Sequence, residues 1–392
     1  MDIHNYKRRL ERTTERIKES KDISERNREI LLKFKDYCLY NNISLGKIDS
    51  YLFYTIKFVF MLKKLIEEAT KEDIQRVIAQ LNQTDYSEET KVCFKIAIRK
   101  LYKMIRGVEE KGEYPPEVKW ISTSLAKNHK KLPEELLTQD EIEQIIRSAD
   151  NLRDKTLLST LAESGARISE IGTMSIKQVS FEEYGARLTI SGKTGTRKIL
   201  VISSTPYLQE WINRHPLNNN PDANLWYNSS QKNHYLSYAR IVAILKEAAK
   251  RAGIKKRVYC HLLRHSQATH MASIMTEGQM KPYFGWTQGS KMASVYVHMS
   301  GKDVDEAIYR ANGVKVEAKE IKNILAPIKC ERCNAINEVT NKFCKICGLP
   351  LDKKEAESII LRDIKLNEAD EFMNRLFKDP EFQELVKRKI KV

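Results

Sequence analysis

The first 107 residues carry apolar side chains spaced three and four apart, with no alternating apolar and polar run of the kind that forms a strand. The spacing is clearest at Ile30, Leu31, Phe34, Tyr37 and Cys38, and again at Val92, Ile96, Leu101 and Ile105. A helix brings residues at this spacing onto one face, where they can be buried together. Residues 1–107 are therefore predicted to form an all-helical domain.

A change of composition follows this helical region. Residues 108–131 contain Gly112, Pro115 and Pro116, which interrupt helices, together with several lysines. This stretch is predicted to be an interdomain linker, and its lysines could follow a phosphate backbone.

The pattern of a second domain, residues 132–327, mixes helices with a short sheet. Thr138 and Glu141 have the spacing of a capping box and predict a helix start. The alternating segments 187–191 and 197–202 predict two strands joined at a hairpin tip, residues 192–195. Further helices are predicted at 153–164, after Pro206 in a first turn, at 238–252 before Gly253, and at 261–273. The expected fold class is mainly α with a small antiparallel sheet.

The last part of the chain has a different character. Residues 328–350 hold two Cys-x-x-Cys pairs, and residues 351–392 form a charged tail whose amphipathic stretch, 366–391, is interrupted near Pro380. A helical tail is predicted.

Composition agrees with several soluble domains and a polyanionic partner. A chain of 392 residues exceeds the usual size of one core. The 68 Lys and Arg against 52 Asp and Glu give a net charge of +16, which favours nucleic acid or an acidic membrane surface as the partner.

The longest apolar stretch, Tyr51 to Leu62, is shorter than the roughly 18 residues of a membrane span and contains Lys57. The N-terminus has no apolar signal-peptide run, and the cysteine spacing is that of a metal site more than a disulfide framework, so a reducing cytoplasm is expected.

Four residues in the second domain offer the groups needed to cut a DNA strand with a side-chain nucleophile. Arg167, in Ser-Gly-Ala-Arg-Ile-Ser-Glu, and Arg264, in His-Leu-Leu-Arg-His-Ser, could each give a phosphate two parallel hydrogen bonds. His261 is three residues before Arg264 at a predicted helix start, so both can face one phosphate. Tyr296, in Tyr-Val-His after Gly285-Trp286, offers a phenol oxygen. An isolated arginine, histidine or tyrosine is usually structural, and only the joint pattern favours a site.

These motifs resemble the active site of the tyrosine recombinases, the phage integrase family, and most closely its archaeal integrase and Xer-like members. The resemblance is specific over residues 137–310 and weaker over the helical N-terminal region, which looks like the family's core-DNA-binding domain. It implies that Tyr296 is the nucleophile, that Arg167 and Arg264 clamp the scissile phosphate, and that His261 handles protons.

The resemblance also assigns three neighbouring residues. Lys193, at the tip of the predicted hairpin, matches the lysine that protonates the leaving 5′ hydroxyl. Trp286 stands where most members have histidine, and its indole N–H can donate a hydrogen bond but cannot transfer a proton at neutral pH. Glu170 matches an acidic position that supports the arginines. His265 and His270 match no motif position and are expected to be capping or core residues.

The function implied is site-specific DNA recombination through a 3′-phosphotyrosyl intermediate, without ATP or a catalytic metal. The family resemblance implies a clamp around double-stranded DNA and a homotetramer on two sites. Two alternatives share the fold: a type IB topoisomerase-like enzyme, and a non-catalytic DNA- or junction-binding protein.

A separate metal site is predicted from the cysteine spacing. Cys330, Cys333, Cys344 and Cys347 have the arrangement of a zinc ribbon with four thiolate ligands. A rubredoxin-like iron site is the main alternative. The zinc would be structural, because four protein ligands leave no open coordination position for catalysis.

Overall fold

The computed structural model describes residues 2–124, 135–192, 194–228, 231–299, 312 and 326–390. The chain divides into two compact units, Asp2–Lys131 and Leu132–Val392, called here the N-terminal and C-terminal units. Each unit is described by itself below.

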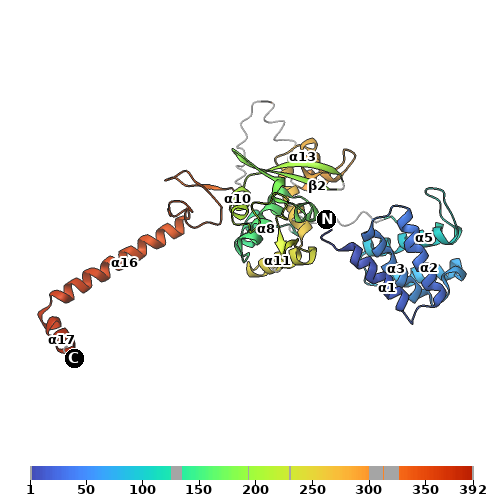
Figure 1. Ribbon diagram of the computed structural model, residues 1–392, viewed down its shortest axis with the longest axis horizontal. Helices are drawn as coiled ribbons and strands as arrows, with labels where there is room; N and C mark the ends of the chain where they lie inside the picture. The colour runs from blue at the N-terminus through green and yellow to red at the C-terminus, as the bar shows by residue number, and fades with distance from the viewer. Residues whose placement is uncertain are drawn as a thin grey trace. The chain divides into compact units, whose positions relative to one another are not determined.

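The N-terminal unit is all-helical over its described residues, as the apolar spacing predicts (Figure 1). Its helices are α1 (Tyr6–Glu19), α2 (Glu25–Tyr40), α3 (Leu45–Leu62), the 3₁₀ turn η1 (Ile66–Glu68), α4 (Lys71–Asn82), α5 (Glu88–Ile105) and α6 (Pro116–Lys119). Polar side chains cap several of them. Ser24 accepts from the backbone N–H of Asn27 at the start of α2, and Thr70 forms a capping box with Asp73 at the start of α4.

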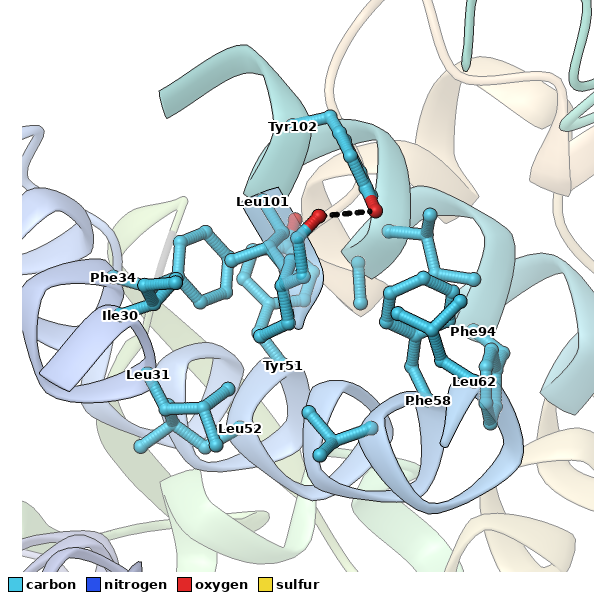
Figure 2. Packing of buried hydrophobic residues seen from close by; sticks show 14 of the residues in the cluster. Ile30, Leu31, Phe34, Tyr51, Leu52, Phe58, Leu62, Phe94, Leu101 and Tyr102 are labelled. Atoms are coloured by element: carbon cyan, nitrogen blue, oxygen red, sulfur yellow. Dashed lines mark hydrogen bonds between the residues drawn. The ribbon is translucent and has the colours of Figure 1, made fainter. Parts of the chain in front are cut away.

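The core of this unit is built around α3, whose apolar side chains meet those of α1, α2 and α5. Figure 2 shows Phe58 beside Phe94 in this core, with Phe34 near Ile30 in another part of the same cluster. The buried Tyr102 keeps its polar end satisfied, because its hydroxyl donates to the Ile66 carbonyl at 3.0 Å (Figure 2).

The segment interpreted as a linker is partly built into this core, so that part of the interpretation is wrong. Pro115 and Pro116 start the short helix α6 rather than an extended connection, as proline at a first turn allows. Val118 and Ile121 are buried in the N-terminal core. Of the predicted linker, residues 125–131 lie outside the described residues.

Helices make up most of the C-terminal unit as far as residue 299. They are α7 (Gln139–Arg147), α8 (Leu152–Ser164), α9 (Ile168–Gly172), the 3₁₀ turn η3 (Ile176–Gln178), α10 (Thr205–Asn213), α11 (Tyr238–Arg251), α12 (Cys260–Ala272), α13 (Glu277–Phe284) and α14 (Met292–Met299). The predicted capping box is present, with Thr138 and Glu141 bonded to each other's backbone N–H groups. Pro206 stands in the first turn of α10, also as predicted.

A three-stranded antiparallel sheet accompanies these helices, in the order β1 (Val179–Glu182), β2 (Gly185–Gly192) and β3 (Gly195–Val201). The inward side of β2 is formed by alternate residues, Ala186, Leu188 and Ile190, all fully buried. The predicted hairpin is confirmed, with Gly192 opposite Gly195 at its end. Strand β1 and the two-stranded pair β4 (Tyr227–Asn228) and β5 (Gln231–Tyr235) were not predicted, because their short segments lack a clear alternation.

The described residues beyond 325 form a small two-stranded element and two helices. These are β6 (Ile328–Lys329), β7 (Ile336–Asn337), α16 (Lys353–Lys378) and α17 (Pro380–Ile390), and Figure 1 shows α16 as one long helix. The interruption predicted near Pro380 is confirmed, but α16 begins before the amphipathic stretch recognised in the sequence. In the part of the chain that the structure describes, no helix combines the length and the apolar character needed to cross a membrane.

Candidate active site

Arg167 and Glu170 occupy the first turn of α9, where their spacing lets them pair. The Arg167 guanidinium donates to Glu170 Oε1 at 2.9 Å, and the Arg167 backbone N–H donates to the other carboxylate oxygen at 2.9 Å. The Glu170 side chain is 1% exposed, whereas that of Arg167 is 31% exposed. Glu170 therefore orients an arginine whose charged end can still reach a ligand.

Arg197 completes this ion-pair network and was not assigned from the sequence. It lies on β3, where it donates to both carboxylate oxygens of Glu170, at 3.2 and 2.8 Å, and to the Tyr283 carbonyl at 3.0 Å. Burial by itself raises the pKa of Glu170, but the hydrogen bonds from Arg197 and Arg167 hold that pKa below its ordinary value. The only sequence signal was the nearness of Arg197 to the hairpin tip, because its pairing depends on strand register.

Gly285 allows the chain to pass close to these arginines. It ends α13 with φ +63°, and a Cβ atom there would lie 2.5 Å from Nη1 of Arg197. Its carbonyl accepts hydrogen bonds from Arg167 at 3.4 Å and from the Thr194 hydroxyl at 3.1 Å. Position 285, which lies between the ion pairs of Arg167 and Arg197 and the neighbouring Trp286, therefore requires glycine.

Arg264 is the most buried cation of the site, at 3% exposure. It donates to the carbonyls of Gly165 and Phe284, each at 2.8 Å, and its guanidinium lies 5.6 Å from the Trp286 ring centroid. Burial and the nearby Arg167 charge lower the pKa of Arg264 to about 10, so it remains a cation at neutral pH. A guanidinium has five N–H donors, and these two bonds leave others for a phosphate.

Tyr296 lies on α14, packed inside this cluster. It is 3% exposed, and its ring stacks on Trp286 with centroids 5.5 Å apart and an angle of 3° between the planes. Trp286 in turn stacks on Phe284 at 4.9 Å. Burial raises the pKa of Tyr296, an effect that the Arg264 charge opposes. The structure therefore shows Tyr296 beside the predicted arginine but in a sheltered position.

His265 contacts the phenol directly, contrary to the expectation that it is only a capping or core residue. Its Nδ1 lies 2.5 Å from the Tyr296 hydroxyl. His261, the histidine predicted to handle protons, is exposed one turn earlier on α12 and meets the His265 ring edge to face at 4.6 Å. The i, i+4 spacing of the two histidines was the available signal. His270 behaves as expected, since it is partly buried and lies within hydrogen-bond distance of Gln139.

The structure thus brings together Arg167, His261, Arg264, Trp286 and Tyr296, and adds Glu170, Arg197 and His265 to them. Lys193, the predicted proton donor, lies outside the described residues. One carboxylate paired with two arginines, a third buried arginine, a phenol and an imidazole are together suited to phosphate transfer, because cations stabilise the charge that develops and the imidazole can take the phenol proton.

The four cysteines of the two Cys-x-x-Cys pairs also come together. Their sulfur atoms all lie within 4.8 Å of one another. The pairs Cys330 with Cys347 and Cys333 with Cys344 are each separated by 3.5 Å between sulfur atoms.

All the active-site residues described above lie within the part of the chain that matches one family model. Residues 135–302 match the model of the phage integrase family. The tyrosine recombinase XerA of Pyrococcus horikoshii is 28% identical over 290 residues, which cover 73% of this chain and 94% of that protein.

Two solved structures share the fold. XerH site-specific recombinase bound to its difH substrate has a TM-score of 0.54 at 19% identity, covering 78% of this chain and 96% of that one. A lambda integrase tetramer bound to a Holliday junction has a TM-score of 0.55 at 12% identity, covering 71% and 78%. The cysteine cluster lies beyond the residues that the family model matches.

Proposed function

We propose that this chain, whose residues 135–302 form a catalytic domain of the phage integrase family, recombines DNA at specific sites through a covalent bond between Tyr296 and a 3′ phosphate. One observation carries the assignment of the nucleophile. Of the residues in the cluster, Tyr296 presents a phenol bonded to an imidazole and next to a buried guanidinium.

The chemistry is a pair of transesterifications. The Tyr296 oxygen attacks the scissile phosphorus while its proton passes to the imidazole of His265, and the bond to the 5′ oxygen breaks. Arg167 and Arg264 would neutralise the non-bridging oxygens, and Lys193 would protonate the departing 5′ oxygen. The 5′ hydroxyl of a partner strand then attacks the phosphotyrosine and releases Tyr296. Each step exchanges one phosphodiester for another, so the bond energy is conserved without ATP.

Engagement of DNA must move Tyr296 from its sheltered position toward the phosphate. The stacked rings of Phe284, Trp286 and Tyr296 form the packing that this movement has to break. A phosphate held by Arg167 and Arg264 would offset the free energy lost with the ring stacking, since it supplies a counter-ion to two neighbouring cations. The nucleophile would in this way become reactive only on bound DNA.

The partner is double-stranded DNA, and a groove in the N-terminal unit fits its backbone. The groove lies between α1 and α3 and is lined by Arg9, Arg12, Thr13, Arg16, Asp49, Ser50, Phe53, Ile56, Lys57 and Phe60. Arg9 is paired with Asp49 at 2.8 Å. Arg12 and Arg16 form no ion pair with any residue that the structure describes, so their charges are available to phosphates.

We also propose that four protomers act together on two sites, in a reducing cytoplasm where the cysteines remain thiols. The lambda integrase tetramer bound to a Holliday junction supports the assembly, and XerH bound to difH supports a duplex substrate. None of the described cysteines is joined in a disulfide.

The direct test uses a library of duplexes in which one bridging 5′ oxygen is replaced by sulfur. Cleavage releases a thiol that cannot reseal the strand, so the protein becomes trapped on the sequences it cuts. The wild type is expected to form a denaturant-resistant adduct on a defined sequence. Tyr296→Phe should form none, whereas Tyr184→Phe, which removes an equivalent hydroxyl from an exposed turn, should match the wild type. An adduct that persists in Tyr296→Phe would refute the assignment. Sequence-independent trapping would instead favour a topoisomerase, and no trapping a binding protein.

A further inference from the structure

The cysteine cluster has the geometry of a metal site and not of disulfides. Sulfur atoms joined in a disulfide are about 2.05 Å apart. Four sulfurs bound to zinc at about 2.3 Å in a tetrahedron are separated by about 3.8 Å. The closest pairs here are 3.5 Å apart and all four sulfurs lie within 4.8 Å, close to the second arrangement.

The backbone around the two pairs repeats the same turn. The residue after each pair, Asn334 or Gly348, has a positive φ, 56° and 72° respectively. The N–H of each of these residues donates to the carbonyl of the first cysteine of its pair, Cys330 or Cys344, at 2.9 Å. The two matching turns place the four thiols within 4.8 Å of one another.

The buried side-chain amide of Asn337 contacts one of the thiols and connects the two turns. Asn337 is fully buried, and its Nδ2 donates to the Ala335 carbonyl at 2.9 Å and contacts Sγ of Cys344 at 3.6 Å. Its Oδ1 accepts the backbone N–H of Lys345 at 3.0 Å. Asn337 therefore ties one turn to the other and offers a hydrogen-bond donor to a thiolate, as groups around metal ligands commonly do.

The loop between the two turns is fixed on the remainder of the C-terminal unit. The Thr340 hydroxyl lies 2.6 Å from the hydroxyl of Tyr207 on α10, a side chain that is almost completely buried. Arg147 at the end of α7 donates to the Val339 carbonyl at 2.9 Å. The adjacent Glu338 is buried as well.

We propose that Cys330, Cys333, Cys344 and Cys347 bind one zinc ion, and that the ion holds residues 338–340 against α7 and α10. Four thiolates satisfy zinc without an open position, so the ion is structural. Ile336, Phe343 and Ile346 of this segment are exposed, so the segment buries little apolar surface of its own. Metal binding therefore supplies much of the free energy that orders it. Loss of the ion would then loosen both the turns and their contacts with Tyr207 and Arg147.

The metal half of the proposal is tested on the full-length protein produced with zinc and iron both available. One zinc per chain is expected by elemental analysis. Cys344→Ser should lose the zinc, and Cys93→Ser, which alters an exposed thiol on α5, should keep it. Wild-type protein that contains iron, or no metal, would overturn the assignment. Because Cys344→Ser could misfold, zinc release from the wild type by a chelator is followed in parallel by the appearance of four alkylatable thiols.

Hydrogen exchange tests whether zinc binding stabilises the contacts of residues 338–340 with the rest of the C-terminal unit. Removal of zinc from the wild type should raise the exchange of amides in residues 338–341 and in α10 at least tenfold, while α5 stays unchanged. Tyr207→Phe should retain zinc but raise exchange at residues 338–341. If the cysteine turns alone respond to zinc removal and α10 does not, the docking role is refuted although the metal site stands.

Discussion

The Tyr296 hydroxyl lies 2.5 Å from Nδ1 of His265, and the tyrosine is only 3% exposed. The same helix that holds His265 also holds Arg264, which contacts the Trp286 ring stacked on Tyr296. One helix thus positions His265, Arg264 and, through Trp286, the ring of Tyr296, to which the proposed mechanism assigns proton uptake, phosphate binding and nucleophilic attack.

The first prediction concerns this contact. His265→Ala removes the acceptor for the Tyr296 proton, and the cleavage rate near neutral pH should fall by about 10² to 10⁴, the range for general acid–base groups. Cleavage by the variant should recover as the pH rises toward the phenol pKa, which burial places above its ordinary value. His265→Asn, whose amide oxygen can accept a hydrogen bond near the Nδ1 position but cannot take up a proton, should be as slow as His265→Ala near neutral pH.

His270→Ala is the matched control, because His270 lies on the same helix and bonds Gln139 instead of the tyrosine. Single-turnover cleavage between pH 6 and 9 measures all three variants. A wild-type rate and pH profile in His265→Ala would show that the contact has no part in the reaction.

The second prediction concerns Glu170. Glu170→Gln keeps the shape but leaves Arg167 and Arg197 without their buried counter-charge, so the free energy of unfolding at pH 7 should fall by about 3 kcal/mol. Because the folded pKa of Glu170 lies below the unfolded value, the carboxylate stabilises the fold above the unfolded pKa, and this stabilisation is lost as the pH falls through the folded pKa.

The difference between Glu170→Gln and the wild type should therefore be full at neutral pH and should shrink in acid. Urea unfolding at several pH values measures it. Glu182→Gln, which alters a pair with Arg187 on the surface, should change little at any pH. If the difference in unfolding free energy between Glu170→Gln and the wild type stays constant down to pH 3, Glu170 is not the group whose protonation removes this stabilisation.

Local sequence signals predicted local structure well, and the site only in part. The capping box at Thr138 and Glu141 and the hairpin of β2 and β3 depend on residues close in sequence, so their patterns were visible. The contact of His265 with Tyr296 joins residues 31 positions apart and depends on how α12 packs on α14. Helix spacing placed His261 and Arg264 near each other, but not the difference in their burial, which only tertiary packing decides.

Gly285 is the subject of the third prediction. Gly285→Ala combines an unfavourable backbone conformation with a collision, since the new Cβ would lie 2.5 Å from Nη1 of Arg197. Gly253→Ala is its control, because Gly253 also has a positive φ, +71°, but nothing lies within 4 Å of its Cβ position. Gly253→Ala should lose about 1 kcal/mol of stability from strain alone. Gly285→Ala should lose more, and cleavage should slow because Arg197 and the Gly285 carbonyl shift. Equal stability losses in thermal unfolding would mean that Arg197 moves aside at no cost.

The last prediction addresses DNA affinity in the N-terminal unit. If Arg12 and Arg16 each neutralise one phosphate, replacing both by alanine should weaken binding at every DNA sequence and reduce the magnitude of the slope of log K against log salt by about 1.8.

Arg26 and Arg106 supply a matched control, because each is already paired with a carboxylate, on Glu67 and Glu117 respectively. Replacing that pair removes the same formal charge but should release few additional counterions, so its slope should stay near the wild-type value. Fluorescence anisotropy between 50 and 300 mM salt gives the slopes, with the helical circular dichroism of each variant as the check on folding. Equal slopes in the two double variants would mean that this groove does not hold the DNA backbone and that the charge acts only through the overall field of the protein.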